Sequence, residues 1–326
     1  MHIPNLLILA TGGTIAGQAG SATKRDYRPG QIEIGAFLQE VGKLGLNAQL
    51  VGRQIANIGS EDIGPAIWRE LHSAASAAMD DLQIDAIIIT HGTDTAEETA
   101  FLLDLTLPAD KPVVLVGAMR PADAVGSDGL RNFAIAMRVA TDPAAAGRGV
   151  LLVMGEEVLA ARDARKARTT GTNAFAGFPR GAVGLATPTT LDWLGAPWRV
   201  GNKARHHFPA EFPDVPILHA YAGMGADSVT MLLERGARGI VLAGFGDGNA
   251  PELVREELAK AAGGGIMVVR SSRVDAGLVD RDPQDDSLGF VAARALGPAK
   301  ARILAQLLIA EGVTDPAEAQ AAFDRR

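Results

Sequence analysis

The sequence contains no cysteine among its 326 residues. This absence excludes disulfide bonds and metal sites built on thiolates, and it leaves the cellular compartment open. Histidine is scarce as well. The chain has six histidines, and the adjacent His206 and His207 do not have the spacing of a zinc motif. We therefore predict that the protein binds no metal.

Long hydrophobic runs are also missing. No segment approaches the ~18 consecutive apolar residues that a membrane-spanning helix needs. No signal peptide is visible, because the first predicted strand begins by Asn5. These patterns predict a cytoplasmic protein without a membrane partner, or a periplasmic protein whose leader has been removed.

Positive charge is in short supply. The formal net charge is −7, whereas proteins that bind nucleic acid usually carry a strongly basic face. The densest basic run, RDARKAR at 162–168, is too short to change this balance. We predict no nucleic-acid partner.

The chain does contain a regular alternation of short apolar runs and amphipathic stretches. The runs are rich in Val, Ile and Leu and apolar on both faces, as parallel strands covered on both sides must be. We predict strands at 5–10, 48–56, 85–90, 112–117 and 149–154. Helices are predicted between them at 32–44, 62–80, 95–106 and 127–141. This order predicts an α/β protein with a doubly wound, mainly parallel sheet.

A proline-rich stretch without periodicity interrupts the alternation, as is typical of a linker between domains. Beyond it, strands are predicted at 215–220, 238–244 and 265–270, and helices at 224–236, 251–262, 298–310 and 316–324. Pro298 and Pro316 stand where the first turn of a helix tolerates proline. We expect an N-terminal catalytic α/β domain (1–187), a linker (188–214) and a smaller C-terminal α/β domain (215–326), the last a parallel sheet with flanking helices.

Two of the apolar runs end in glycines and hydroxyl side chains. They are ILATGGTIAG, residues 8–17, and AIIITHGTDT, residues 86–95. Ligands of open α/β sheets bind beyond the carboxyl ends of the strands, where glycine lets backbone N–H groups approach a substrate closely. We expect one site assembled from both ends, although the first motif alone also fits a phosphate loop or a tight turn. TGGTIAG lacks the spacing of a dinucleotide-binding loop, so we predict no cofactor.

A hydroxyl nucleophile needs a base, and three residues are candidates. His91 lies in the second motif but fits a buried structural histidine equally well. Tyr27 is one of only two tyrosines. Lys166 is flanked by arginines at 162, 165 and 168, which would lower its pKa by disfavouring its charged form. The alternative is that this basic run is a solvated loop.

Asp94 immediately precedes the helix predicted at 95–106. Aspartate is a good N-cap residue, so we predict that Asp94 caps this helix. It then acts either as a cap alone or as a cap that also presents its carboxylate to a substrate ammonium group.

These two motifs resemble signature segments of the bacterial L-asparaginases. The resemblance continues in order over essentially the whole chain, and such an ordered set is very specific. The further segments are SATKRDY (21–27), NIGSED (57–62), KPVVLVGAMRP (111–121), RDARK (162–166), GDGN (246–249) and VVRSSR (268–273). The SATKRDY segment and the short linker look closer to the type II branch of the family.

The resemblance implies a fold of two α/β domains and roles for individual residues. Thr14 resembles the primary nucleophile that attacks the side-chain amide, and Tyr27 resembles a residue of the mobile lid beside it. Thr93, Asp94 and Lys166 resemble a second catalytic cluster, in which lysine and threonine activate the attacking group or a water molecule.

Substrate-binding residues are implied in the same way. Ser60, which follows Gly59 in the NIGSED segment, resembles the group that binds the α-carboxylate. Asp94 and Glu61 resemble the acceptors of the α-ammonium group. The backbone carbonyl of Ala118 resembles the contact to the leaving amide.

The family assembles as a homotetramer, a dimer of intimate dimers with the sites at the dimer interface. Asn249 matches a residue that many type II enzymes contribute across that interface. These enzymes usually also contribute a glutamate, where this chain has Asp282. Its carboxylate is one methylene shorter and is followed by the stiff Pro283.

We therefore interpret the chain as an L-asparaginase, which converts L-asparagine and water to L-aspartate and ammonia through a β-acyl-threonine intermediate. A glutaminase–asparaginase that also accepts L-glutamine is the nearest alternative. An amidotransferase subunit would need an extra N-terminal domain and a partner surface. A non-catalytic amino-acid binding protein would be expected to lack Thr14, Thr93 or Lys166, and all three are present.

Overall fold

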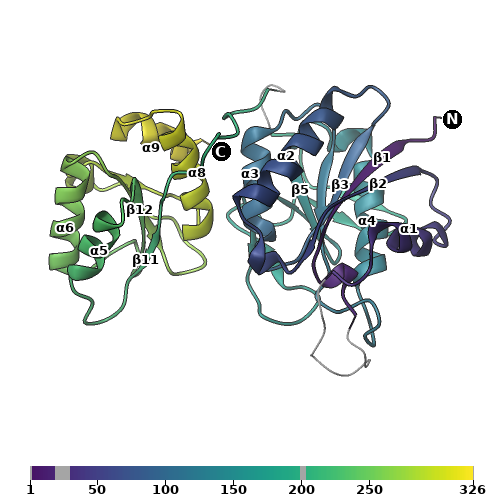
Figure 1. The fold of residues 1–326 in the computed structure, drawn as a ribbon, viewed down its shortest axis with the longest axis horizontal. Helices are drawn as coiled ribbons and strands as arrows, with labels where there is room; N and C mark the ends of the chain where they lie inside the picture. The colour runs from purple at the N-terminus through teal and green to yellow at the C-terminus, as the bar shows by residue number, and fades with distance from the viewer. Residues whose placement is uncertain (1, 19–29, 199–202, 326) are drawn as a thin grey trace. The chain divides into compact units, whose positions relative to one another are not determined.

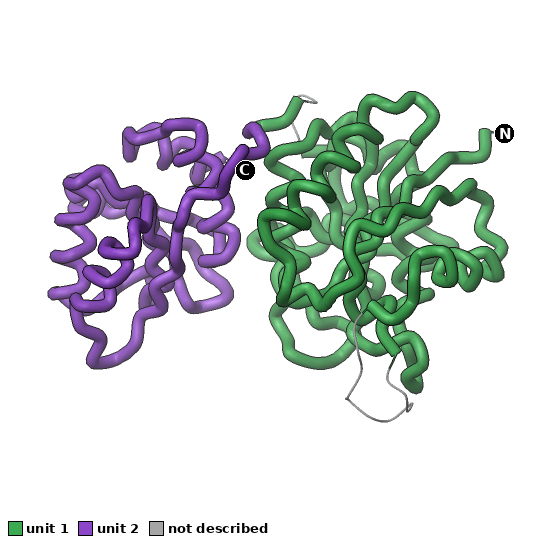
Figure 2. The backbone as a smooth tube through the Cα atoms, viewed as in Figure 1, with its two compact units in different colours: residues 1–205 green, residues 206–326 purple. Residues whose placement is uncertain are grey.

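The computed structural model describes residues 2–18, 30–198 and 203–325. It divides the chain into two compact units, residues 1–205 and 206–326 (Figure 2). Each unit is built on its own sheet, with eight strands in the first and four in the second among the described residues. The predicted fold class, two α/β units with a larger, mainly parallel sheet first, is confirmed.

The large sheet has the strand order β10-β9-β6-β5-β4-β3-β1-β2. Its parallel strands are β1 (Asn5–Gly12), β2 (Gln49–Ile58), β3 (Ala86–Thr90), β4 (Val113–Val116) and β5 (Val150–Met154). Three antiparallel strands extend it, namely β6 (Glu157–Ala160), β9 (Gly184–Ala186) and β10 (Leu191–Trp193). A separate hairpin pairs β7 (Ala164–Lys166) with β8 (Phe175–Gly177). The five parallel strands were predicted. The antiparallel strands and the hairpin were not, because they do not lie in a six-residue apolar run such as PVVLVG, which includes β4.

Helices cover both faces of the large sheet. Figure 1 shows α1 (Ile34–Gly42) and α4 (Gly129–Ala140) on one side, with α2 (Pro65–Asp80) and α3 (Ala96–Thr106) on the other. Each face has a separate apolar core: Phe37 and Phe133 meet edge to face at 5.0 Å on the first, and Leu71 and Leu103 are buried on the second. Short 3-10 turns are found at η1 (Thr14–Ala16), η2 (Ser60–Asp62) and η3 (Pro143–Ala145). The sheet is therefore doubly wound, as predicted.

One strand departs from the predicted burial. We expected all five parallel strands to be covered on both faces, but β2 lies at the edge of the sheet and only Ile55 in it is buried. The prediction was wrong because β2 carries polar residues such as Arg53 and Gln54, and Val51 is 53% exposed. Edge strands commonly carry charged residues, which oppose pairing with other chains.

The second unit has four parallel strands in the order β11-β12-β13-β14 among its described residues. They are β11 (Ile217–His219), β12 (Gly239–Gly244), β13 (Met267–Ser272) and β14 (Phe290–Ala292). The helices are α5 (Asp227–Glu234), α6 (Glu252–Gly263), α7 (Pro283–Ser287), α8 (Pro298–Ala310) and α9 (Pro316–Asp324). Pro298 and Pro316 stand in the first turns of α8 and α9, as predicted. Only α7 and β14 were absent from the sequence prediction.

The segment 188–214, predicted as a linker, contributes to the first unit. Its residues 191–193 form β10, which pairs with β9. The buried Arg148 guanidinium stacks on Trp193 at 4.0 Å from the ring centroid and donates to the carbonyl of Gly195 at 2.7 Å. The first unit runs to residue 205. This proline-rich segment therefore contains a strand, followed by a loop that is bonded to Arg148.

Within the part of the chain that the structure describes, no helix combines the length and the hydropathy needed to cross a bilayer.

His91 lies directly after β3 and is completely buried. Its Nδ1 lies 2.7 Å from the carbonyl oxygen of Gly92. Burial lowers its pKa to about 4, and the hydrogen bond to that carbonyl opposes the shift only partly. The imidazole is therefore neutral at pH 7, and of the two alternatives for His91 this environment fits the buried structural histidine.

This burial makes the protein sensitive to acid. The pKa of His91 is lower in the folded state than in the unfolded chain, so the unfolded state takes up the proton first. Stability is then unaffected above about pH 6.5 and falls as the pH drops toward 4. Between pH 7 and 5 we expect His91 to account for a loss of about 2 kcal/mol in the free energy of unfolding.

Denaturant unfolding of the wild type and of His91→Asn at both pH values isolates this contribution. The asparagine amide can still donate to the carbonyl of Gly92 but does not titrate. If the free energy of unfolding fell equally in the two proteins between pH 7 and 5, the acid sensitivity could not be attributed to His91.

Candidate active site

The site lies at the carboxyl ends of four neighbouring parallel strands. In the order β2-β1-β3-β4 these strands lead into Ser60, Thr14, Thr93 and Ala118. The connections leave β1 and β3 toward opposite faces of the sheet, α1 on one and α3 on the other. In doubly wound sheets such a switch point is the place where ligands bind. This topology is consistent with the expectation, drawn from the two sequence motifs, that Thr14 and Thr93 flank one site.

Glycine brings the loops after β1 and β3 into contact. A Cβ on Gly13 would lie 2.4 Å from the Cα of Gly92, and Gly13 has φ = 78°, a conformation that favours glycine. Gly92 in turn packs against Ser60, because a Cβ on it would lie 2.7 Å from Oγ of Ser60. The residues that follow, Thr14 and Thr93, are thereby held near each other, and both are 6% exposed.

Lys166 reaches this site from the β7–β8 hairpin. Its Nζ donates to Oγ1 of Thr93 at 2.8 Å and to Oδ1 of Asp94 at 2.5 Å. The lysine side chain is only 19% exposed, whereas that of Asp94 is 60% exposed. A hydroxyl, an amine and a carboxylate therefore form a connected set, with the carboxylate toward solvent.

The predicted role of Asp94 as an N-cap was wrong. Helix α3 is preceded by Thr95 as its N-cap residue, and no side chain caps it. The carboxylate of Asp94 pairs with Lys166 instead, while its backbone N–H donates to Oγ of Ser60 at 3.1 Å. Thr95 donates through Oγ1 to the carbonyl of Ser60 at 2.8 Å. These two bonds tie the loop after β3 to the loop after β2.

The start of the basic run is anchored in the protein. Asp163 is 1% exposed and forms an ion pair with Arg180, and its carbonyl accepts a hydrogen bond from the N–H of Phe178 at 3.0 Å. Burial lowers the pKa of the Arg162 guanidinium to about 10, and Asp163 opposes this shift. A solvated loop therefore does not describe the segment that carries Lys166.

Two residues that the sequence analysis missed support the loop at Ala118. The carboxylate of Asp128 accepts hydrogen bonds from the N–H groups of the two residues after Ala118, each at 3.0 Å. Asn132 donates to the carbonyl of Gly117 at 2.9 Å and to Asp128 at 3.0 Å. An Asp and an Asn four residues apart at the start of a predicted helix share one face, which is the signal that could have identified them.

The first unit does not contain the described positions of three further predicted site residues. Asn249 and Asp282 belong to the second unit, and Tyr27 lies outside the described residues. The backbone of Asn249 pairs with that of Phe245 after β12, through two bonds of 2.8 Å. The carboxylate of Asp282 caps α7 by accepting the N–H of Gln284 at 2.8 Å.

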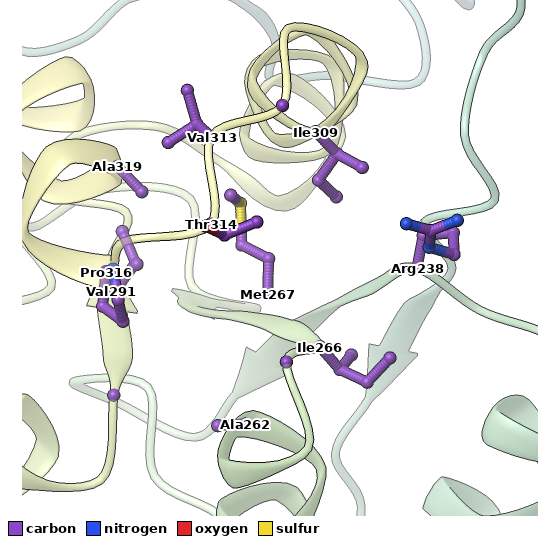
Figure 3. Close-up of a pocket in the computed structure, with 13 residues that line it drawn as sticks. Arg238, Ala262, Ile266, Met267, Val291, Ile309, Val313, Thr314, Pro316 and Ala319 are labelled. Carbon is purple, nitrogen blue, oxygen red and sulfur yellow. The ribbon is translucent and has the colours of Figure 1, made fainter.

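The second unit also contains a pocket of about 110 Å³ that includes none of the predicted site residues (Figure 3). Arg238, Ile266 and Gly289 line it, and each immediately precedes a strand of the four-stranded sheet. It therefore lies at the amino ends of these strands, whereas Asn249 follows the carboxyl end of β12.

The arrangement suits hydrolytic chemistry that uses a hydroxyl nucleophile. An amine in contact with a threonine hydroxyl can exchange a proton with it, and the carboxylate of Asp94 accepts a second hydrogen bond from the same amine. Among the described residues, no three His, Asp or Glu side chains come together as a set of metal ligands.

Comparison with known proteins gives consistent results over both units. Residues 5–199 match the family model described as asparaginase, N-terminal, and residues 214–323 match the glutaminase/asparaginase C-terminal domain.

Individual relatives cover nearly the whole chain. The probable L-asparaginase periplasmic of Haemophilus influenzae is 40% identical, over 99% of this chain and 93% of that protein. L-asparaginase 2 of Escherichia coli is also 40% identical, over 100% of this chain and 94% of that protein. The glutaminase-asparaginase of Pseudomonas fluorescens is 35% identical, over 98% of this chain and 90% of that protein.

A solved structure shares the fold as well. It is a probable cytoplasmic L-asparaginase from Campylobacter jejuni, with a TM-score of 0.91 and 34% identity, covering 99% of this chain and 100% of that one. Together with the two family models, these relatives show that the chain belongs to the asparaginase family.

Proposed function

We propose that the protein is an L-asparaginase that hydrolyses the side-chain amide of L-asparagine to L-aspartate and ammonia. The observation that carries the proposal is the contact of Lys166 with both Thr93 and Asp94, at the switch point where Thr14 also lies. Membership of the asparaginase family supports it.

In the proposed reaction the hydroxyl oxygen of Thr14 attacks the side-chain amide carbon of asparagine. The hydroxyl proton of Thr14 is transferred to the amide nitrogen, the carbon–nitrogen bond breaks, ammonia leaves, and a β-acyl ester on Thr14 remains. A water molecule, activated by Thr93 and Lys166, then hydrolyses this ester and restores the threonine. Backbone N–H groups and hydroxyls around Thr14 and Thr93 are the candidate donors to the developing oxyanion, where one missing donor typically costs ~2.7–4 kcal/mol.

The proposed substrate contacts fit a free amino acid, which is a zwitterion. Oγ of Ser60 accepts the N–H of Asp94, so its own O–H is available to donate to an α-carboxylate. The exposed carboxylate of Asp94, with that of Glu61, can receive an α-ammonium group. The carbonyl of Ala118 is proposed to contact the leaving amide, on the loop that Asp128 holds.

Relatives with both names, L-asparaginase and glutaminase-asparaginase, match this chain at 35–40% identity. Glutamine hydrolysis is therefore the second candidate activity. Initial rates of ammonia release from L-asparagine and L-glutamine give kcat/KM for each, and we expect asparagine to be preferred. A higher kcat/KM for glutamine would favour the glutaminase–asparaginase, and no release from either would overturn the proposal.

We further propose that the protein acts as a homotetramer, built as a dimer of intimate dimers. In this proposal Asn249 and Asp282 complete the site of a neighbouring subunit, and Tyr27 belongs to its lid. The support is the resemblance of GDGN (246–249) to the family segment.

The two threonines should act as one unit. We expect Thr14→Ala and Thr93→Ala each to lower kcat by about 10³-fold or more while the fold is retained, and the double variant to lose little more than either. Single-turnover and steady-state ammonia assays, with circular dichroism to check folding, measure this. A double variant whose loss equals the product of the two single losses would contradict a shared mechanism.

Lys166 should affect turnover more than binding. Lys166→Met removes the proposed proton shuttle, so kcat should fall by about 10²–10⁴-fold with a much smaller change in KM. Lys166→Arg should not restore kcat, because a guanidinium stays protonated. Lys43→Met is the matched control, since that side chain is 68% exposed on the surface. Near wild-type turnover in the arginine variant would exclude a proton-shuttle role.

Gly59 leaves room for the carboxylate of Glu61. A Cβ at position 59 would lie 2.4 Å from Oε1 of Glu61, so Gly59→Ala must displace this flexible side chain. We expect KM for asparagine to rise by about 10-fold, as even ~1 Å of misplacement can lower rates ~10²-fold. Gly64→Ala is the control, because nothing lies within 4 Å of its added Cβ. Equal KM values in the two variants would exclude Glu61 from substrate binding.

The carboxylate of Asp282 caps α7 and is also proposed to contribute to the active site. One substitution can separate these two roles. Asparagine caps helices as well as aspartate, so Asp282→Asn should keep the stability of the second unit while it removes the charge. If the carboxylate contributes to the site, KM should rise by several-fold. Asp315→Asn is the matched control, since Asp315 caps α9 in the same way before Pro316. An unchanged KM in Asp282→Asn would show that Asp282 acts as a cap only.

A further inference from the structure

Asn249 and Asp282 belong to two segments of the second unit that meet at one buried side chain. The first segment, 245–249, follows β12, and the second, 279–287, includes α7 and leads to β14. Between them in the sequence lies β13, which carries Arg270. Arg270 is 6% exposed.

The guanidinium of Arg270 holds both segments. Its Nη1 donates to the carbonyl of Asp247 at 2.5 Å, and its Nη2 donates to the carbonyl of Asp280 at 2.7 Å. Its Nε forms an ion pair with the carboxylate of Asp285 in α7. Each backbone contact is two residues away from a proposed site residue, Asn249 in one segment and Asp282 in the other.

The two segments also contact each other directly. The carboxylate of Asp247 accepts the N–H of Asp280 at 2.7 Å. Gly248, at φ = 82°, allows this close arrangement, because a Cβ there would lie 3.3 Å from Nη1 of Arg270. A side chain at position 248 would be strained at this φ and would crowd the guanidinium.

A buried guanidinium is an unusual choice for stability alone. Removing an ion from water costs several kcal/mol, and well-packed apolar residues often replace a buried ion pair without loss. What a guanidinium offers and an apolar side chain does not is a rigid planar fork with donors in several fixed directions. At position 270 these donors fix the relative placement of two backbone segments.

We propose that Arg270 is a positioning residue that sets the placement of Asn249 and Asp282 as a pair. This inference rests on the proposed function, in which both residues complete an active site. Arg270 itself contacts no substrate in this proposal. Its effect on catalysis passes through the two segments, so it should alter substrate binding more than turnover.

Arg270→Lys is the most direct test. Lysine keeps the positive charge beside Asp285 but cannot reach both carbonyls through a planar fork. We expect KM for L-asparagine to rise about 10–10²-fold, with kcat within about 3-fold of the wild type. The matched control is Arg255→Met, because Arg255 pairs with the same Asp285 at 2.6 Å without contacting either carbonyl. It should lower the melting temperature but leave KM unchanged.

A second variant does not disturb the buried cluster. Asp247→Ala removes the bond between the segments at an exposed side chain and should also raise KM without changing kcat. It keeps the inference testable if Arg270→Lys fails to fold.

Double variants decide whether the effect passes through Asn249. In an Asn249→Ala background, Arg270→Lys and Asp247→Ala should change KM much less than they do in the wild type. Equal fold-changes in both backgrounds, or a KM for both variants equal to that of Arg255→Met, would overturn the inference.

The outcomes separate this inference from the proposed function. If the wild type hydrolyses asparagine but Asn249→Ala leaves KM unchanged, the roles of Asn249 and Arg270 both fall while the asparaginase activity stands. If the wild type does not hydrolyse asparagine, the proposed function itself falls.

Discussion

The contact between the backbones of Gly13 and Gly92 is the constraint on which the proposed site depends. β1 and β3 are neighbours in the sheet, and their loops can approach this closely only if residue 13 has no side chain, because a Cβ there would lie 2.4 Å from the Cα of Gly92. A side chain at position 92 would instead meet Ser60. The next residue in each loop is a threonine. The separation of the two hydroxyls is therefore set mainly by backbone packing, which is stiffer than a pair of long side chains would be.

Other residues of the site contact the loop after β3, which carries Gly92. Ser60 packs on Gly92 and is bonded to the loop after β3, and Lys166 reaches the same loop from the β7–β8 hairpin. The start of the segment that carries this hairpin is anchored by the ion pair of the buried Asp163 with the partly exposed Arg180. Rigid supports of this kind suit catalysis, because preorganised groups need not rearrange as charge develops.

The sequence predicted the elements that lie in longer apolar runs or show a helical period. Most of the parallel strands and most helices were found, whereas β6 to β10, β14 and α7, at three to five residues, were not. The contrast between β2 and its buried neighbours was missed, because strand order decides which strand lies at an edge.

The sequence pointed to candidate site residues that lie in local motifs, but not to residues that act through long-range hydrogen bonds. Thr14, Thr93 and Lys166 lie in recognisable segments, but the cap assigned to Asp94 failed because a lysine 72 residues away competes for its carboxylate. Asp128 and Asn132 act through hydrogen bonds to backbone groups of a distant loop, and no local pattern specifies that partner. Long-range polar contacts are what the sequence alone left open.

The edge position of β2 has a consequence for how firmly the two sides of the site are held. Among the strands of the described residues, β1, which leads to Thr14, is hydrogen-bonded to a strand on each side, while β2, which leads to Ser60, is bonded to β1 alone. Segments with fewer protected backbone hydrogen bonds open locally at lower free energy. Amide hydrogens of β2 should therefore exchange with solvent faster than those of β1. The loop of Ser60, the proposed contact for the substrate carboxylate, would then loosen while the loop of Thr14, the proposed nucleophile, stays in place.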